Sequence, residues 1–366
     1  MTRIALRSPM LMLVGLLLPV APALAAATDH SAEVKRLLAT AKNSGERELN
    51  LTWSESVLGG SEGAKKFEAL FNRMYGTEIK VNFTPGPSMT DVAGKLAQEV
   101  AAGQKGSADL FLGTEQHYGG LWDRNVLEEY DYTRLSPRIR REFVIPRNTA
   151  VEISTILSGI SYNTNMIGPA DVPRKLEQVL NPRWKGKIAS TQNASIFERV
   201  AMRNEWGPEK MKAFVTKLSE QVAGLTRTTE VERVVSGEFA MLVMDAGVHH
   251  TRRFQAQGAP VGHVIPEDAG TVAFLHLGVP RNAGQSNLAK LFINMAMSEA
   301  GQKIIYETYL TDHHELPGSQ SAAALSDLKS KGIGLLRVDV KFVTERPEMN
   351  KLRLELVKIL REKRAG

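Results

Sequence analysis

Strand-type runs and helical segments alternate along the first third of the chain, and this alternation constrains the fold more than any other feature. Residues 48–53, 78–83 and 108–112 have the apolar and β-branched composition of strands. Residues 63–75 and 88–102 lie between them and repeat apolar side chains at helical spacing. Strand–helix–strand order at this spacing predicts βαβ units and mostly parallel sheets with flanking helices, an α/β fold.

A second block of alternating elements follows the first. We predict its strands over 151–162, 187–190, 239–244 and 271–279, and helices over 287–297, 302–309 and 350–363. "SIFE" at Ser195 and "TEVE" at Thr229 have the form of a capping box, so we expect helices to begin there. The length of the chain favours two lobes over one domain.

In such sheets ligands bind beyond the C-terminal ends of the strands. Helix N-termini at these loops have free N–H groups that attract anions. We therefore predict that polar and aromatic residues of these loops bind the ligand: Trp53, Ser54, Glu55, Ser61, Thr114, Glu115, Thr191, Asn193 and Ser195. Core packing of Trp53 and simple helix capping by the serines are the competing explanations.

The first 25 residues have the features of a secretory signal peptide. Arg3 and Arg7 form a basic region, residues 10–18 are apolar, and Ala23-Leu24-Ala25 gives an A-x-A cleavage pattern. The apolar run is shorter than the roughly 20 residues of a transmembrane helix. We therefore expect a soluble periplasmic product of 341 residues, secreted across the inner membrane.

The amino-acid composition excludes cysteine chemistry and argues against nucleic-acid binding. The chain contains no cysteine, which excludes disulfides, thiol nucleophiles and cysteine metal sites. The formal net charge is +6, and removing Arg3 and Arg7 with the signal leaves +4. The basic residues are dispersed, so we expect no nucleic-acid partner, although a mildly basic surface suits anionic small ligands.

Several stretches together resemble the type II periplasmic solute-binding proteins of ABC importers. They are "AKNSGERELNLTWSES", "ADLFLGTEQHYGGLWDRNVLEEYD", "NPRWKGKIAST", "VVSGEFAMLVMDAGVHH" and "GAPVGHVIPEDAGTVAFLHLGVPRNAGQSNLAKLFINMAMSEAGQKII". They run over most of the chain from about Ala32 to Tyr309. The resemblance is to the branch of extracellular solute-binding proteins that includes the ferric-ion binding proteins.

The resemblance implies two α/β lobes that close on a ligand in the cleft between them. Lobe 1 is expected over 31–155 plus about 272–318, and lobe 2 over 156–271 plus about 319–366, with crossover strands near 156–162 and 271–279. It also implies a monomer without catalysis or cofactor, which delivers a small polar ligand to an inner-membrane ABC permease.

The pair His249-His250 stands where the ferric-binding branch has adjacent tyrosines. Ferric iron prefers oxygen donors, whereas imidazole suits softer metals. Adjacent helix residues do not share a face, so two imidazoles at this position do not converge on one ion, and the same holds for His313-His314. We therefore expect an organic anion or zwitterion and no metal, with ferric iron or a ferric chelate as the alternative ligand.

The segment 245–254 suggests how such a ligand is held. If it is helical, Asp245 and His249 are four residues apart, and Arg252 and Arg253 follow on the same side. Asp245 then fixes the tautomer of His249, and an arginine supplies a planar fork for a carboxylate or phosphonate. We therefore add Asp245 and His249 to the predicted ligand-binding residues.

A serine hydrolase is the remote alternative. Residues 59–63, "GGSEG", match the G-x-S-x-G nucleophile pattern around Ser61. That pattern requires a tight turn directly from strand to helix. Residues 54–58 separate the predicted strand from the motif, so we expect no enzyme.

Overall fold

The computed structural model describes residues 31–194, 196–227 and 229–362, so the predicted signal peptide at 1–25 lies outside the described residues. No helix within these ranges is both long enough and apolar enough to cross a membrane.

The described chain contains both helices and strands throughout its length. The helices are α1 (Ala32–Ser44), α2 (Gly60–Tyr75), α3 (Met89–Ala101), α4 (Tyr118–Asp123), α5 (Phe197–Val200), α6 (Pro208–Gln221), α7 (Glu232–Val235), α8 (Val248–Gln255), α9 (Ser286–Ala296), α10 (Glu299–Tyr309), α11 (Ser321–Ser330), α12 (Val340–Thr344) and α13 (Glu348–Glu362). The strands are β1 (Glu48–Trp53), β2 (Lys80–Pro85), β3 (Phe111–Thr114), β4 (Ala150–Ser158), β5 (Ile160–Asn163), β6 (Ile188–Thr191), β7 (Val222–Thr226), β8 (Met241–Val243), β9 (Val261–Val264), β10 (Thr271–Gly278) and β11 (Leu336–Arg337).

Local sequence signals explain some of the helix ends. The Ser88 side chain accepts a hydrogen bond from the Asp91 N–H and begins α3, and Gly76 ends α2 in the left-handed conformation. The capping box predicted at Thr229 is wrong. Helix α7 begins three residues later, after Val231, without a side-chain cap.

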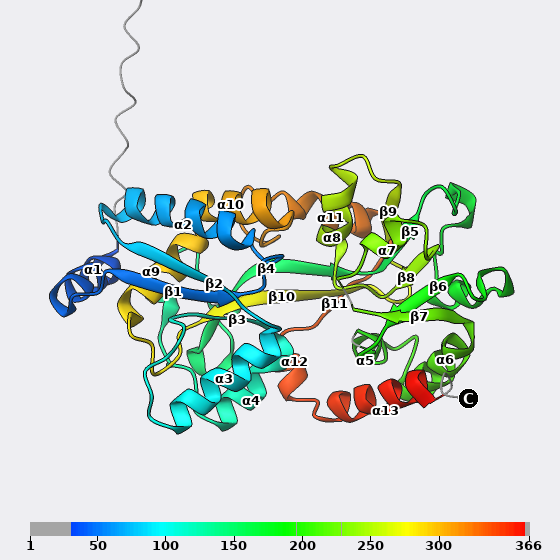
Figure 1. The fold of residues 1–366 in the computed structure, drawn as a ribbon, viewed down its shortest axis with the longest axis horizontal. Coiled ribbons are helices and arrows are strands. Elements are labelled where there is room, and N and C mark those ends of the chain that lie inside the picture. The colour runs from blue at the N-terminus through cyan, green and yellow to red at the C-terminus, as the bar shows by residue number, and fades with distance from the viewer. Residues whose placement is uncertain (1–30, 195, 228, 363–366) are drawn as a thin grey trace, which may run out of the picture.

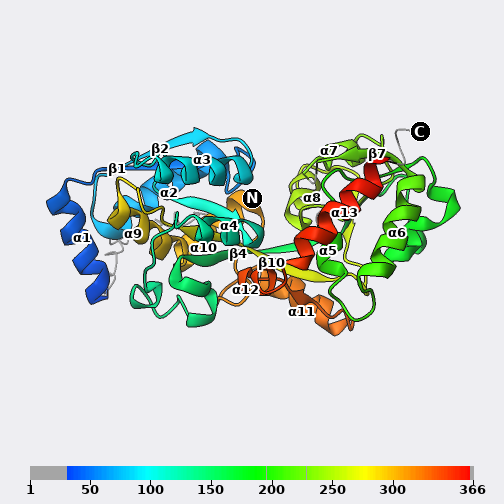
Figure 2. The same cartoon turned by 90° about the horizontal axis from the view of Figure 1, so that it is seen from below.

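The elements gather into two lobes joined by extended strands (Figures 1 and 2). In lobe 1, apolar side chains of β1, α2 and α9 form one core: Leu49, Leu51, Phe67, Phe71 and Phe292. In lobe 2, the sheet β7-β6-β8-β5-β9 packs with α5, α6 and α13 around a second core: Ile188, Phe197, Phe214, Met241 and Leu356. The α/β fold with two lobes is therefore confirmed.

Strands β4 and β10 pair antiparallel and run between the lobes. β4 continues into β5 through Gly159, where a Cβ atom would lie 2.4 Å from the Val264 carbonyl oxygen. Strand β5 also pairs antiparallel with both of its neighbours, whereas β6 is parallel to β7 and β8. The sheets are thus mixed rather than mostly parallel, because the crossover strands reverse the chain direction.

The C-terminal segment touches both lobes. Helix α12 lies against α4 and the 3-10 turn η1 (Glu115–His117) of lobe 1, whereas α13 packs on α5 and α6 of lobe 2. Between them, Arg337 of β11 binds both carboxylate oxygens of the buried Glu152 on β4, at 2.7 and 2.6 Å. We retain 31–155 with 272–318 and 156–271 with 319–366 as the proposed lobes, with α12 reaching across from the second to the first.

Candidate functional site

A buried ion pair joins the two lobes at the ends of strands β3 and β6. Glu115 follows β3 in lobe 1, and Arg199 lies on α5, which follows β6 in lobe 2. Arg199 Nη2 lies 2.5 Å from Glu115 Oε1, and both side chains are almost fully buried. The loops beyond the C-terminal ends of the two strands therefore meet, and we take their contact as the centre of the candidate site.

Local hydrogen bonds hold the loop after β3 in place. The Thr114 N–H donates to His117 Nδ1 at 3.1 Å, and the other ring nitrogen of His117 lies 3.3 Å from Thr90 Oγ1 at the start of α3. Burial lowers the pKa of His117 to about 4, so the ring is neutral at physiological pH. A neutral ring leaves Glu115 without a cationic partner from its own loop.

The charges at the lobe interface do not balance. Glu198 is also buried, and its Oε1 lies 3.6 Å from Arg199 Nε. Burial raises the pKa of both Glu115 and Glu198, and Arg199 opposes this effect at each. Asp339 adds negative potential at Glu115, whereas Arg353 adds positive potential at Glu198. One buried guanidinium thus serves two buried carboxylates.

Among the described residues, several buried polar side-chain atoms at and after the ends of β3 and β6 lack hydrogen-bond partners. They include Oγ of Ser190 and Oγ1 of Thr191 at the end of β6, Oε2 of Glu198, and Oε2 of Glu115, the oxygen that does not face Arg199. Buried polar groups in folded proteins are nearly always hydrogen-bonded. A group of exceptions at one lobe interface is typical of a place where a bound molecule supplies the partners.

A second contact between the lobes lies at α8. The His249 ring of lobe 2 packs on the Tyr309 ring of α10 in lobe 1, with 4.3 Å between the ring centres. Arg252 Nη1 donates to the Leu310 carbonyl oxygen at 3.1 Å. Both nitrogens of His249 lack hydrogen-bond partners among the described residues. Burial, His250 and the nearby arginines hold the His249 pKa well below its usual value.

The predicted alignment of Asp245 with His249 is wrong. Gly247 has a φ of 142°, so α8 begins after it and Asp245 lies outside the helix. Asp245 accepts hydrogen bonds from Ser161 Oγ and the Gly247 N–H and pairs with His263 at 3.3 Å. Burial favours a raised pKa, but pairing with His263 reverses this and lowers it. Asp245 therefore stabilises lobe 2 and does not orient His249.

In the loop after β1, the residues predicted to bind the ligand contact other parts of the protein instead. Trp53 is buried in the lobe 1 core, where its ring packs edge-on against Phe83 at 5.6 Å. Glu55 accepts hydrogen bonds from the Ser61 N–H at 2.8 Å and from Ser61 Oγ at 3.0 Å. The chain's own carboxylate thus occupies the helix N-terminus that was predicted to attract an anion, while Ser54 contacts Ser56.

Ser61 does not stand on a nucleophile elbow. Six residues separate the end of β1 from the start of α2, and Ser61 is the second residue of that helix. Its hydroxyl donates to a carboxylate and not to an imidazole. The strand–turn–helix context that the motif needs is therefore missing at this serine.

The structure thus brings together some of the predicted residues and separates others. Thr114, Glu115 and Thr191 lie at the meeting strand ends, and His249 lies at the second contact. Asn193 is exposed in the loop after β6, and Ser195 lies outside the described residues.

Sequence reasoning missed Glu198, Arg199 and Tyr309. Glu198 was interpreted as part of a capping box, but α5 begins at Phe197 after Ile196, without a side-chain cap. The sequence pattern that could have identified Glu198 and Arg199 is a pair of adjacent charged residues within the otherwise apolar stretch "IFERVAM". Charged side chains are rarely fully buried unless paired, so their position in that stretch indicated a partner.

A family model described as bacterial extracellular solute-binding protein matches residues 105–332, which is more than half of the chain. The chain belongs to this family. It is a solute-binding and not an enzymatic family, which agrees with the arrangement around Ser61. No curated protein matches the chain in sequence.

Solved structures share the fold of this solute-binding protein at low sequence identity. The substrate-binding protein of an ABC transporter from Agrobacterium tumefaciens has a TM-score of 0.70 at 17% identity, over 87% of this chain and 96% of that one. Iron-bound HitA from Pseudomonas aeruginosa has a TM-score of 0.67 at 16% identity, covering 85% and 99%. AgtB from A. tumefaciens R10, in complex with agropinic acid, has a TM-score of 0.67 at 15% identity, covering 86% and 99%.

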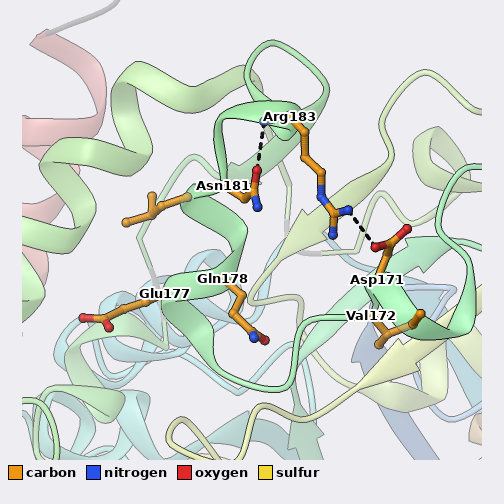
Figure 3. Close-up of a pocket in the computed structure, with 8 residues that line it drawn as sticks. Asp171, Val172, Glu177, Gln178, Asn181 and Arg183 are labelled. Atoms are coloured by element: carbon orange, nitrogen blue, oxygen red, sulfur yellow. Dashed lines mark hydrogen bonds and ion pairs between the residues drawn. The ribbon is translucent and has the colours of Figure 1, made fainter.

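Three surface cavities of the solute-binding protein are lined by neither Glu115 nor Arg199. The one in Figure 3, of about 310 Å³, lies on residues 170–183 of lobe 2, where Arg183 pairs with Asp171 at 2.6 Å and both are largely exposed. A second, of about 330 Å³, lies between α10 and residues 312–320, and a third, of about 200 Å³, lies beside Glu152. None of them is lined by a predicted ligand-binding residue.

Proposed function

We propose that the chain is the exported solute-binding component of an ABC importer. It captures a small polar organic ligand, an anion or a zwitterion, between its lobes and delivers it to an inner-membrane permease. Family membership supports the solute-binding role. The observation that carries the ligand site is the buried pair of Glu115 and Arg199 across the lobes, together with unpartnered polar atoms on Glu115 itself and on residues at and after the end of β6.

Arg199 is suited to an organic ligand that carries a carboxylate. Its planar guanidinium presents several N–H donors in a fork that matches carboxylate geometry. In the structure the carboxylate of Glu115, from the other lobe, lies against this guanidinium. We propose that the ligand takes over this position, so that closure depends on the ligand.

Ferric iron or a ferric chelate is the second candidate. HitA and AgtB share the fold, and their structures contain iron and agropinic acid respectively, so the fold itself accommodates both classes. In this chain, His249 and His250 stand at the position of the tyrosine pair, and the pKa of each is lowered by burial. Imidazole nitrogens suit a hard ferric ion less well than phenolate oxygens do, which supports the organic ligand.

A thermal-shift screen of carboxylates, phosphonates, amino acids and ferric salts, before and after chelator treatment, tests this function. We expect an organic compound to raise the melting temperature and chelator treatment to leave that shift intact. Arg199→Gln should abolish the shift, while His250→Ala should reduce it less than His249→Ala, because His249 packs directly on Tyr309 of the other lobe. Stoichiometric iron that is lost in His249→Ala would contradict the organic ligand and favour the iron alternative.

A further inference from the structure

The Glu115, Glu198 and Arg199 side chains form a buried trio that carries one more acid than base. Glu115 and Arg199 are 1% and 7% exposed, and Glu198 is 5% exposed. Arg199 lies between the two carboxylates, at 2.5 Å from Glu115 and 3.6 Å from Glu198. A buried charge without compensation is strongly destabilising, so a trio of this composition favours the arrival of positive charge.

The surroundings of the trio do not supply that charge directly. Arg353 of α13 acts on Glu198 only at long range, and its own Nη2 donates to Asn350 Oδ1 at 2.8 Å. On the other side, Asp339 adds further negative potential at Glu115. The neighbouring His117 is held neutral by burial. The local potential therefore opposes a simple anion, although a guanidinium suited to a carboxylate is present.

The hydrogen-bonding capacity of the buried side chains also favours a ligand that carries positive charge. Oε2 of Glu198 and Oε2 of Glu115 have no hydrogen-bond donor among the described residues, whereas Oε1 of Glu115 faces Arg199. In their ionised form the carboxylates only accept hydrogen bonds. The hydroxyls of Ser190 and Thr191 are also unpartnered and buried. A ligand that satisfies this set needs N–H donors for the carboxylates and an acceptor for the guanidinium.

We infer that the ligand is a zwitterion, whose carboxylate displaces Glu115 from Arg199 and whose cationic nitrogen binds the carboxylates of Glu198 and the released Glu115. This inference rests on the proposed solute-binding function and narrows its ligand class. A dianion leaves the two glutamates unpaired. A dication cannot replace Glu115 at Arg199, so it can bind only the carboxylate of Glu198.

Three compounds with the same five-carbon chain test the inference on the wild-type protein: glutarate, 5-aminopentanoate and cadaverine. Isothermal calorimetry is run at up to about 10 mM, which covers the millimolar affinities expected of small fragments. We expect 5-aminopentanoate to bind at least tenfold more tightly than the other two. Tighter binding of glutarate or cadaverine overturns the inference, and so does the absence of binding by all three.

Variants then assign the two ends of the ligand. Glu198→Gln should remove the preference for 5-aminopentanoate over glutarate. Arg199→Gln should remove the preference for 5-aminopentanoate over cadaverine. Glu205→Gln is the matched control, because Glu205 lies on the following loop, is half-exposed and, among the described residues, forms an ion pair with Arg203 alone. Equal effects of Glu198→Gln and Glu205→Gln on the three affinities overturn the inference.

The failure of this inference is distinguishable from failure of the proposed function. If the ligand screen finds a compound that binds while 5-aminopentanoate does not, the chain is a solute-binding protein with a ligand of another class. If variants unfold, the three affinities of the wild-type protein still decide the question, since that comparison needs no substitution.

Discussion

Replacing Trp53 distinguishes a core residue from a ligand contact. The sequence placed this side chain at the C-terminal end of a strand, where it would stack on an organic ligand. In the structure it is 2% exposed within the lobe 1 core, and its ring packs against Phe83. We therefore predict that Trp53→Ala and Trp53→Phe change the stability of the protein and leave the ligand affinity within about twofold, since neither alters the lobe interface.

The magnitudes follow from the burial. Trp53→Ala removes a large buried ring and leaves a cavity, which costs about 3–5 kcal/mol. Trp53→Phe loses part of that packing, about 1–2 kcal/mol. The indole Nε1 has no hydrogen-bond partner among the described residues, so its removal also relieves an unsatisfied donor that costs about 1–3 kcal/mol. We therefore expect Trp53→Phe to lie within about 1 kcal/mol of the wild type.

Differential scanning calorimetry and ligand titration measure the two effects separately. At about 2–4 °C per kcal/mol for a unit of this size, Trp53→Ala should lower the melting temperature of lobe 1 by about 6–20 °C and Trp53→Phe by less than about 4 °C. A Trp53→Phe variant with unchanged melting temperature and tenfold weaker ligand binding would refute the reasoning, because it would make the indole a ligand contact.

Three further predictions concern other contacts. Glu55→Gln should lower the melting temperature by about 1–3 °C and make added sulfate more stabilising than it is for the wild type. The reason is that the Glu55 carboxylate, which accepts from Ser61, no longer fills the α2 N-terminus. Equal sulfate effects on both proteins in a thermal-shift assay would argue against this. Asp245→Asn should cost about 1–3 kcal/mol in urea unfolding through its weakened pairing with His263, and an unchanged midpoint would count against a structural role. Lowering the pH from about 7.5 to about 5 should lower the melting temperature less in His250→Gln than in the wild type. Burial lowers the folded-state pKa of His250 to about 4, so between about pH 6.5 and that value only the unfolded chain takes up the proton. Parallel curves of melting temperature against pH for the two proteins would show that His250 does not cause the loss.

Elements with strong local signals were predictable from the sequence. The strand predicted over 48–53 is β1, and the start predicted at 88 and the end predicted at 75 coincide with the Ser88 cap of α3 and the Gly76 stop of α2. These signals depend on side-chain alternation, on capping hydrogen bonds and on the conformational freedom of glycine, all of which act within a few residues. The family resemblance added the order of the lobes, which no local pattern contains.

The candidate site was only partly predictable, because its main contacts join distant parts of the chain. Glu115 was identified from its loop, but nothing near it in the sequence indicated that Arg199 of the other lobe would pair with it. The Asp245 prediction failed for a local reason. Helical spacing was extended through Gly247, whose φ of 142° lies outside the helix, so a four-residue separation did not place Asp245 beside His249.

Small-angle scattering of the mature protein, with and without the ligand found by the screen, tests the central proposal most directly. A ligand that contacts both lobes favours the closed form, because only differential affinity shifts such an equilibrium. We predict a smaller radius of gyration when the ligand is added to the wild type and no change when it is added to Arg199→Gln. A tightly bound ligand that leaves the wild-type scattering curve unchanged would contradict capture between the lobes.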